Sequence, residues 1–491
     1  MLGTIAPFGL TLLIAAGVVV LALLSNRISA RLRIPAPAIF LVGAAAASDL
    51  IPSLRTISIE TIEQIVTVAL VVILFDGGMD IGARKLRLAL GPVLAIGVLG
   101  TFLTAGATAV LAHVLFGFPW LIALLLGTAL APTDPAVVFS VLGNREVQGR
   151  AGVIIEGESG ANDPVGIALL VSLLTVRPEN GFGSAVLGVL GEFMLQMAVG
   201  AAVGVAGGWL LLQLMRRFAL PSEGLYPLRT LAISIALYGA ATALHGSGFL
   251  AVFLAGILIG DAAAPFKGEI ERFHASLASL AEIIAFVLLG LTVSLSDLIT
   301  TNAWLIGLVL AALLTFVVRP LVLGPLLMAA RLKPGERIFV LWCGLKGAVP
   351  ILLGTYILAT GSARDVLVYE IIFAVVLFSV VVQGALVPTV ADRCGVRMRR
   401  VEPRPWALGV RLRNEPDGAR RYRIVPGAPA DGRSVRDLHL GHDIWISLVV
   451  RDGHPVQVRG DTRLRAGDEV LVLVDPEATR DPAPLFTRSG S

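Results

Sequence analysis

Long hydrophobic runs alternate with short polar loops from the N-terminus to about residue 392. A bilayer core needs about twenty mostly apolar residues per helix, and division at the polar loops predicts about thirteen transmembrane helices. Their expected limits are 8–24, 34–50, 62–80, 89–115, 120–142, 151–176, 186–214, 226–244, 248–265, 278–298, 303–330, 337–360 and 367–392. The pattern predicts an all-α polytopic membrane protein with a transmembrane domain over residues 1–394. Its first run is expected to be a retained span rather than a signal peptide.

Two of the hydrophobic runs are interrupted near their middle. The run 120–142 contains Ala131-Pro132-Thr133-Asp134-Pro135, and the run 337–360 contains Gly344-Leu345-Lys346-Gly347-Ala348-Val349-Pro350. Proline removes a backbone donor and breaks a helix, and a broken helix within a membrane is tolerated only where it lines a cavity. The two runs lie seven apart in order, which predicts inverted repeats with two broken crossing helices near the midplane.

The basic residues of the loops are distributed unevenly between the two sides of the membrane. One set of alternate loops holds Arg27, Arg31, Arg33, Arg84, Lys85, Arg87, Arg145, Arg150, Arg216, Arg217, Lys267, Arg272, Arg331, Lys333 and Arg337, whereas the other holds Arg55, Arg177 and Arg364. Because basic loops stay in the cytoplasm, we expect the N-terminus outside and the C-terminus inside. We expect a bacterial inner membrane as the location.

The composition agrees with lipid as the solvent of most of the chain. Charged residues make up 15% of the sequence and the mean hydropathy is +0.84, whereas a soluble chain carries about a quarter charged residues. The net charge is only +4, so the basic loops indicate membrane orientation rather than nucleic-acid binding. The two cysteines, Cys343 and Cys394, lie far apart and indicate neither a disulfide framework nor a zinc site.

Polar sequence takes over after residue 394. We expect a linker over residues 395–419, a small cytosolic α/β domain over 420–475 and a disordered tail over 476–491. Within the small domain, the runs 444–450, 455–458 and 469–474 have the composition of β-strands between Gly and Asp turns.

The run 151–176 carries an unusual group of polar residues. Glu158, Ser159, Asn162 and Asp163 follow one another within six positions, and an ionisable group at mid-membrane costs roughly 2.5–3.5 kcal/mol on insertion scales. Hard monovalent cations prefer oxygen ligands, which these side chains supply. A carboxyl group in a partly dehydrated cavity can exchange a proton for such a cation. These residues therefore predict cation/proton antiport.

Each of these charges also has a structural interpretation. Asn162 and Asp163 could act only as a buried polar pair that holds helices together, although the neighbouring polar residues favour function. Glu158 is expected to pair with Arg319, and a structural salt bridge is the favoured interpretation of that pair. Lys346 could equally be structural or functional, and it could neutralise the C-terminal ends of the facing half-helices.

Four ordered motifs carry a resemblance to a known family. Leu74-Phe75-Asp76-Gly77-Gly78, Ala131-Pro132-Thr133-Asp134-Pro135, Gly157-Glu158-Ser159 with Asn162-Asp163, and Gly344-Leu345-Lys346-Gly347-Ala348 resemble the sodium/proton exchanger family, and more narrowly the monovalent cation:proton antiporter-1 group. The resemblance covers roughly residues 5–392. It implies a scaffold and dimerisation domain beside a moving core domain, and hence a homodimer.

The resemblance also implies roles for individual residues. Asp163 would be the exchanging carboxylate with Asn162 beside it, and Thr133, Asp134 and Ser159 would help to bind the cation. An Asn-Asp pair goes with electroneutral exchange in this family. Lys346 is a departure, because the family usually has arginine there and lysine lacks its planar fork of donors.

The small domain is similar to the C-terminal subdomain of the regulator of potassium conductance proteins. The similarity rests on Gly432-Arg433-Ser434-Val435-Arg436-Asp437-Leu438, Arg451-Asp452-Gly453 and the run 461–468. It favours K⁺ over Na⁺ as the cation exchanged for H⁺. No cofactor is expected, and the sequence names no regulatory ligand for this domain.

Two other classes of function are less consistent with the sequence. A gated cation channel would need repeated carbonyl filters, and no such motif is present. A symporter for an organic solute would want a larger polar or aromatic cavity than five tyrosines and six tryptophans suggest.

Overall fold

The computed structural model divides the chain into two compact units, Met1–Pro403 and Arg404–Ser491. It describes residues 17, 20, 35–51, 54, 57–143, 145–175, 182–262, 264–360, 363–400, 420–441, 444–451, 454–474 and 481–487. Of the expected first span, 8–24, only two positions are among the described residues. The part of the expected linker that follows residue 400 lies outside them.

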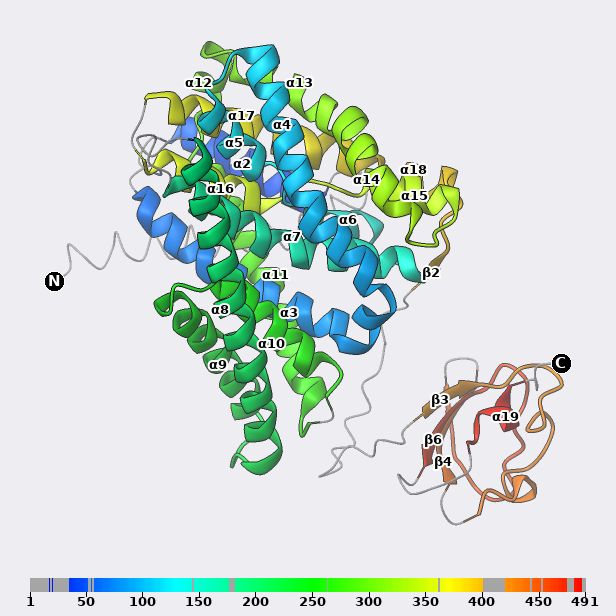
Figure 1. Ribbon diagram of the computed structural model, residues 1–491. Coiled ribbons are helices and arrows are strands. Elements are labelled where there is room, and N and C mark those ends of the chain that lie inside the picture. Colours follow the sequence, from blue (N-terminus) through cyan, green and yellow to red (C-terminus); the bar gives the residue numbers. More distant parts are fainter. Residues whose placement is uncertain are drawn as a thin grey trace, which may run out of the picture. The chain divides into compact units, whose positions relative to one another are not determined.

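The first unit is a bundle of helices (Figure 1). Its N-terminal half contains α2 (Ala36–Leu50), α3 (Ile59–Leu94), the π-helical turn η2 (Ala95–Leu99), α4 (Gly100–Phe116), α5 (Trp120–Ala129), α6 (Pro135–Leu142), α7 (Arg150–Leu174) and α8 (Phe182–Arg217). Its C-terminal half contains α9 (Leu225–Ala243), α10 (Gly248–Gly260), α11 (Lys267–Leu291), α12 (Leu295–Thr300), α13 (Ala303–Leu313), η4 (Leu314–Val318), α14 (Arg319–Met328), α15 (Pro334–Trp342), α16 (Ala348–Leu358), α17 (Ala363–Phe378), η5 (Ser379–Gln383) and α18 (Gly384–Arg393).

Helix lengths and composition support a multi-pass membrane protein. In the described part of the chain, five helical stretches are long and apolar enough to cross a membrane, and shorter apolar helices accompany them. The stretch Ile59–Phe116 has 58 residues, about 87 Å of helix, far more than one bilayer crossing needs. It breaks at Gly82 (φ 62°), between the expected spans 62–80 and 89–115, and at Ala89, where the second of them begins.

Helix α11 differs from its expected limits. The helix begins at Lys267, well before the expected start of the 278–298 span, and ends at Leu291, and the short helix α12 follows. The early start extends α11 through a polar stretch that hydropathy alone assigns to a loop. Its first two turns carry the ion pairs Lys267–Glu271 and Arg272–Glu269, and such pairs stabilise helix ends.

Both predicted helix breaks are confirmed. The first broken helix consists of α5 and α6, separated by residues 130–134. Pro135 occupies the first turn of α6, where its missing N–H costs nothing, and the Asp134 carboxylate caps that turn by accepting from Ala136 N at 2.9 Å. The second consists of α15 and α16, separated by residues 343–347.

A short β-pair connects distant parts of the first unit. Strand β1 (Arg145–Val147), in the loop between α6 and α7, pairs antiparallel with β2 (Met398–Arg400), which follows α18. Gln148 N also donates to Arg397 O at 3.0 Å. The chain that leaves the last helix is therefore hydrogen-bonded to the loop that enters α7.

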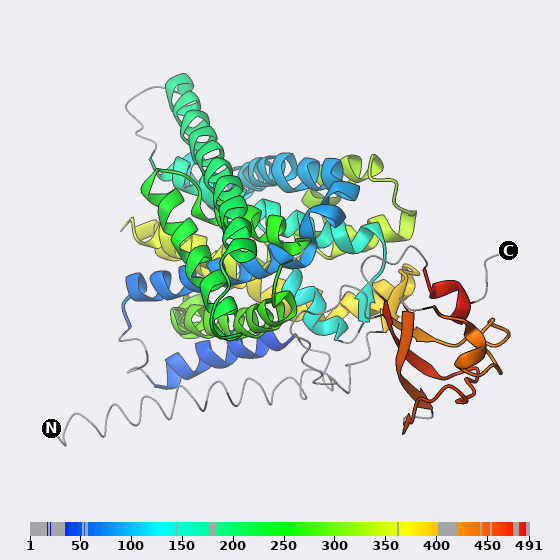
Figure 2. The same cartoon turned by 90° about the horizontal axis from the view of Figure 1, so that it is seen from below.

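The second unit is built on an antiparallel four-stranded sheet (Figure 2). The strands β3 (Arg420–Arg423), β4 (Ile444–Arg451), β5 (His454–Val456) and β6 (Glu469–Val474) lie in the order β3-β6-β4-β5. The three predicted strands are present, whereas β3 is an addition. Helical structure in the described part of this unit is limited to η6 (Arg436–Leu438) and α19 (Ala483–Phe486).

The expectation of a disordered tail over residues 476–491 is wrong for its middle part. Residues 483–486 form α19, and the Phe486 ring is fully buried and stacks on Tyr422 at 5.2 Å between ring centroids. Val425 N donates to Phe486 O at 3.1 Å. Phe486, a single aromatic residue that gives only a weak sequence signal, is therefore part of the hydrophobic core of this unit.

A buried ion pair stabilises this unit. Asp468 is 1% exposed and accepts from Arg451 Nε and Nη2 at 2.9 and 2.8 Å and from Arg465 N at 2.8 Å. Burial raises the pKa of Asp468, but the hydrogen bonds and charge of Arg451 lower it, and the net pKa lies below the usual range. Its stabilising contribution is therefore complete above about pH 4 and lost as the pH falls through the lowered pKa.

Substitution Asp468→Asn is expected to destabilise this unit by about 2 kcal/mol, because it removes hydrogen bonds between charged groups. The measurement is hydrogen exchange of strands β4 and β6 in the full-length protein at neutral pH, where protection should fall. Asp461→Asn, at an exposed position, is the control and should leave protection unchanged. Equal protection in both variants would contradict the prediction.

Candidate functional site

The site begins with the crossing of the two broken helices. Asp134 N donates to Leu345 O at 2.8 Å, so the two non-helical segments are directly hydrogen-bonded. A Cβ atom at Gly347 would collide with the Asp134 carboxylate, so only glycine permits this approach. Asp134 Oδ1 accepts from Ala136 N, and Ala348 N is also among its hydrogen-bond partners. The carboxylate thereby lies at the N-terminal ends of both α6 and α16, where the helix dipoles favour negative charge.

Lys346 provides the opposite charge at the crossing. Its Nζ atom donates to Ala131 O at 2.9 Å and to Pro132 O at 3.1 Å, carbonyls that follow the C-terminal end of α5. The side chain is buried. The structure thus places this lysine against carbonyls that lie beyond the end of α5, one of the two roles that the sequence leaves open for it.

Helix α7 brings Ser159, Asn162 and Asp163 to the first crossing segment. Ser159 Oγ donates to Thr133 O at 2.5 Å, and Asn162 Nδ2 donates to Thr133 Oγ1 at 2.8 Å. Thr133 N donates in turn to Asn162 Oδ1 at 3.3 Å. Asn162 and Ser159 therefore hold Thr133 on three atoms, while all four side chains are buried.

Asp163 differs from its neighbours. Its Oδ1 atom is buried and has no hydrogen-bond partner among the described residues. The charged groups that act on it are Asp134 and Lys346, both from the crossing segments. An unpartnered buried carboxylate oxygen is costly, so this oxygen is a candidate site for a proton or a cation.

Glu158 and Arg319 form a bidentate pair beside this group. Arg319 Nη1 and Nη2 donate to Glu158 Oε1 and Oε2 at 2.8 and 3.0 Å. Arg319 also donates to Leu341 O at 2.7 Å and Val340 O at 3.2 Å near the end of α15. The guanidinium therefore connects α7, α14 and the second broken helix, and every polar atom of the pair has a partner.

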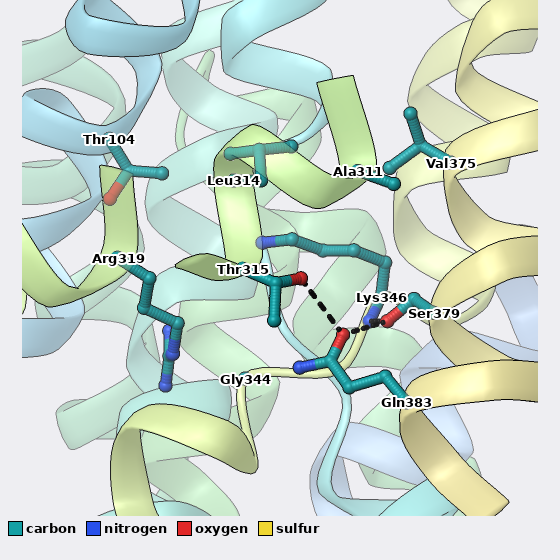
Figure 3. A pocket seen from close by; sticks show the side chains of 10 residues that line it. All are labelled: Thr104, Ala311, Leu314, Thr315, Arg319, Gly344, Lys346, Val375, Ser379 and Gln383. Atoms are coloured by element: carbon teal, nitrogen blue, oxygen red, sulfur yellow. Dashed lines mark hydrogen bonds between the residues drawn. The ribbon is translucent and has the colours of Figure 1, made fainter. Parts of the chain in front are cut away.

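A small cavity lined by both polar and apolar side chains lies between Arg319 and Lys346 (Figure 3). It is lined by Thr104, Ala311, Leu314, Thr315, Arg319, Gly344, Lys346, Val375, Ser379 and Gln383. Its space is about 10 Å³, enough for about one water molecule. Figure 3 shows the Gln383 side chain pointing toward Thr315 and Ser379, and Ser379 Oγ accepts from Lys346 N at 2.8 Å.

Sequence reasoning missed the residues that position the second crossing segment. Gln383 Nε2 donates to Trp342 O at 2.6 Å and Trp342 Nε1 donates to Gln383 O at 3.1 Å. Ser379 and Gln383 belong to the π-helical turn η5, and Thr315 to η4. Gln383, a polar residue within an apolar run, was a signal that the sequence offered for this site. The π-helical turns have no recognisable sequence signal.

Comparison with known proteins agrees with this geometry. The profile described as "Sodium/hydrogen exchanger, transmembrane" matches residues 17–393, and the TrkA-C domain profile matches residues 419–486. This chain belongs to the sodium/hydrogen exchanger family. The second match includes α19, which supports the extension of the small unit beyond residue 475.

Relatives of the exchanger cover nearly the whole chain. The K(+)/H(+) antiporter NhaP2 of Shewanella sp. (strain ANA-3) is 32% identical over 485 residues, 97% of this chain and 83% of that protein. The K(+)/H(+) antiporter NhaP of Alkalimonas amylolytica is 32% identical over 469 residues, 94% of this chain and 81% of that protein.

A solved structure shares the exchanger's fold. The sodium proton antiporter MjNhaP1 from Methanocaldococcus jannaschii at pH 8 superposes with a TM-score of 0.66 at 21% identity, covering 78% of this chain and 99% of that one. This similarity establishes an NhaP-like arrangement of the helices.

Proposed function

We propose that this exchanger moves K⁺ against H⁺, one for one, with Asp163 carrying the proton and the cation in turn. Cation:proton antiport itself follows from the family and from the antiporters it resembles over almost its full length. The observation that carries the role of Asp163 is its buried, unpartnered Oδ1 atom beside Asp134 and Lys346.

The neighbouring oxygens complete the proposed cation site. Ser159 Oγ and Thr133 Oγ1 keep lone pairs after making their hydrogen bonds. Asp134 adds negative charge while it caps two helices. Asn162, tied to Thr133 through both amide atoms, fixes geometry and carries no charge, so one carboxylate alternates between one proton and one cation. This supports electroneutral exchange.

The wider architecture of the proposal follows the sequence. The domain would have thirteen spans in inverted repeats and form a homodimer in a bacterial inner membrane, with the N-terminus outside. The TrkA-C unit would then lie in the cytoplasm as a regulatory domain. The loop charges support this orientation, and the β1–β2 pair gives the chain between the two units a fixed starting point at the loop before α7.

Potassium is the favoured cation, with sodium as the alternative. Both relatives above are named K(+)/H(+) antiporters and this chain carries a TrkA-C domain, whereas the solved neighbour is a sodium proton antiporter. In everted vesicles with a preformed proton gradient, K⁺ should dissipate the gradient at concentrations at which Na⁺ has a smaller effect. Dissipation by Na⁺ and not by K⁺ at equal concentration would overturn the choice of potassium while leaving antiport intact.

A further inference from the structure

An open acidic hollow lies where α3 breaks. It has a volume of about 410 Å³ and is lined by Met79, Asp80, Ile81, Lys85, Gly260, Asp261, Glu271, Arg272 and Ala275. Gly82 makes the break with φ 62°, and Asp261 Oδ2 accepts from Arg84 N. The wall includes three carboxylates and two basic groups, and the excess of negative charge attracts cations.

One face of α11 leads from this hollow toward the broken helices. Glu271, Ala275, Ala278 and Glu282 follow at helical spacing, so they lie on one side of the helix. Glu271 and Ala275 are exposed, whereas Ala278 and Glu282 are half-buried. The distance along the axis from the first to the last is about 16 Å. Between the two glutamates this face carries the small side chains of Ala275 and Ala278.

Glu282 stands at the inner end of this face. Its Oε1 atom is buried and has no hydrogen-bond partner within the part of the chain that the structure describes. The charged group that acts on it is Asp134 of the first crossing segment, and α11 packs against α16, which begins at that crossing. A glutamate that only held helices together would have its oxygens hydrogen-bonded.

We propose that Glu282 is a relay carboxylate between the acidic hollow and Asp163. A cation arriving from the hollow takes the place of the Glu282 proton, which leaves to the water of the hollow. When the cation moves on to Asp163, the Asp163 proton passes back to Glu282, so that one cation enters for each proton released. The relay rests on the proposed exchange at Asp163 and adds a step to it.

Proteoliposomes give the test through the KM for K⁺ and the maximal rate. Glu282→Gln should raise KM about tenfold, the order expected for one lost charge in a partly screened site. Glu282→Asp keeps the charge and should restore KM to within about threefold of wild type. Glu192→Gln is the matched control: Glu192 is a half-buried glutamate of α8 that already has a partner, Gln196, and the variant should behave as wild type.

A second variant tests the route along α11 from the hollow to Glu282 and changes no charged residue. Ala278→Leu fills the face between the hollow and Glu282 and should lower the maximal rate at least about tenfold, whereas Ala240→Leu, exposed on α9, should not. An unchanged KM in Glu282→Gln together with an unchanged rate in Ala278→Leu would overturn the relay. If wild type exchanges cations normally in the same experiment, that result leaves the proposed function standing.

Discussion

Asp163→Asn should abolish cation-driven proton movement, lowering the rate at least about a hundredfold. The amide keeps the shape of the carboxylate but can neither bind an exchangeable proton nor balance the charge of a cation. Thr133, Ser159 and Asn162 bond to one another and not to Asp163 Oδ1, so the crossing should keep its structure. The measurement is the recovery of a pH-sensitive dye in everted vesicles after addition of K⁺ or Na⁺.

The matched control for this variant is Asp297→Asn, an exposed aspartate of α12 outside the site. It should exchange at the wild-type rate. If Asp163→Asn reached the membrane in normal amount and still exchanged cations as wild type does, the assignment of the exchanging carboxylate would be wrong.

Breaking the Glu158–Arg319 pair should destabilise the membrane domain by about 3–5 kcal/mol, because either single substitution leaves a buried charge without compensation. Glu158→Gln leaves the buried Arg319 guanidinium without its counter-charge, and Arg319→Met leaves the buried Glu158 carboxylate without its counter-charge. Both residues are nearly inaccessible, at 3% and 7% exposure, so solvent cannot compensate. The measurement is the thermal unfolding midpoint of each variant in detergent.

The double variant Glu158→Gln/Arg319→Met separates the pair from its surroundings. It should lose less stability than the sum of the two single variants, since no unpaired charge remains. Its stability should remain below that of wild type, because Leu341 O and Val340 O lose their hydrogen-bond donor. A double variant as unstable as the sum of the singles would show that the two charges do not stabilise each other.

The elements recognisable from the sequence share a local cause. Pro132 and Pro135 remove backbone donors inside one hydrophobic run, so a break is required whatever the tertiary structure. Two charges in separate apolar runs, Glu158 and Arg319, are each too costly alone, and their pairing could be expected from this cost. In both cases the penalty for any other arrangement is several times thermal energy.

What could not be read from the sequence depends on packing between distant elements. That Asn162 holds Thr133, rather than reaching for a cation, follows from the position of α7 against the crossing. Glu282 looks isolated in its run, and only the fold brings it near Asp134. The burial of Phe486 in the small unit likewise needs a sheet whose first strand, β3, has a basic sequence with little strand signal.

Lys346 in place of the family's arginine is accommodated by the geometry. The ammonium group reaches two carbonyl oxygens, Ala131 O and Pro132 O, and its three donors suffice for both. A planar fork is needed for a carboxylate, and that function belongs to Arg319. Lysine in place of arginine therefore changes the hydrogen-bond donor, while the carbonyl oxygens after α5 keep a partner.

The central claim is that one carboxylate carries either the proton or the cation. The most direct measurement is proton release from purified protein in weakly buffered detergent solution when K⁺ or Na⁺ is added. Wild type should release close to one proton per cation bound, and Asp163→Asn, measured together with Glu282→Gln so that the relay carboxylate cannot release its own proton, should release none. Cation binding without proton release in wild type, or the same release from both proteins, would contradict the account.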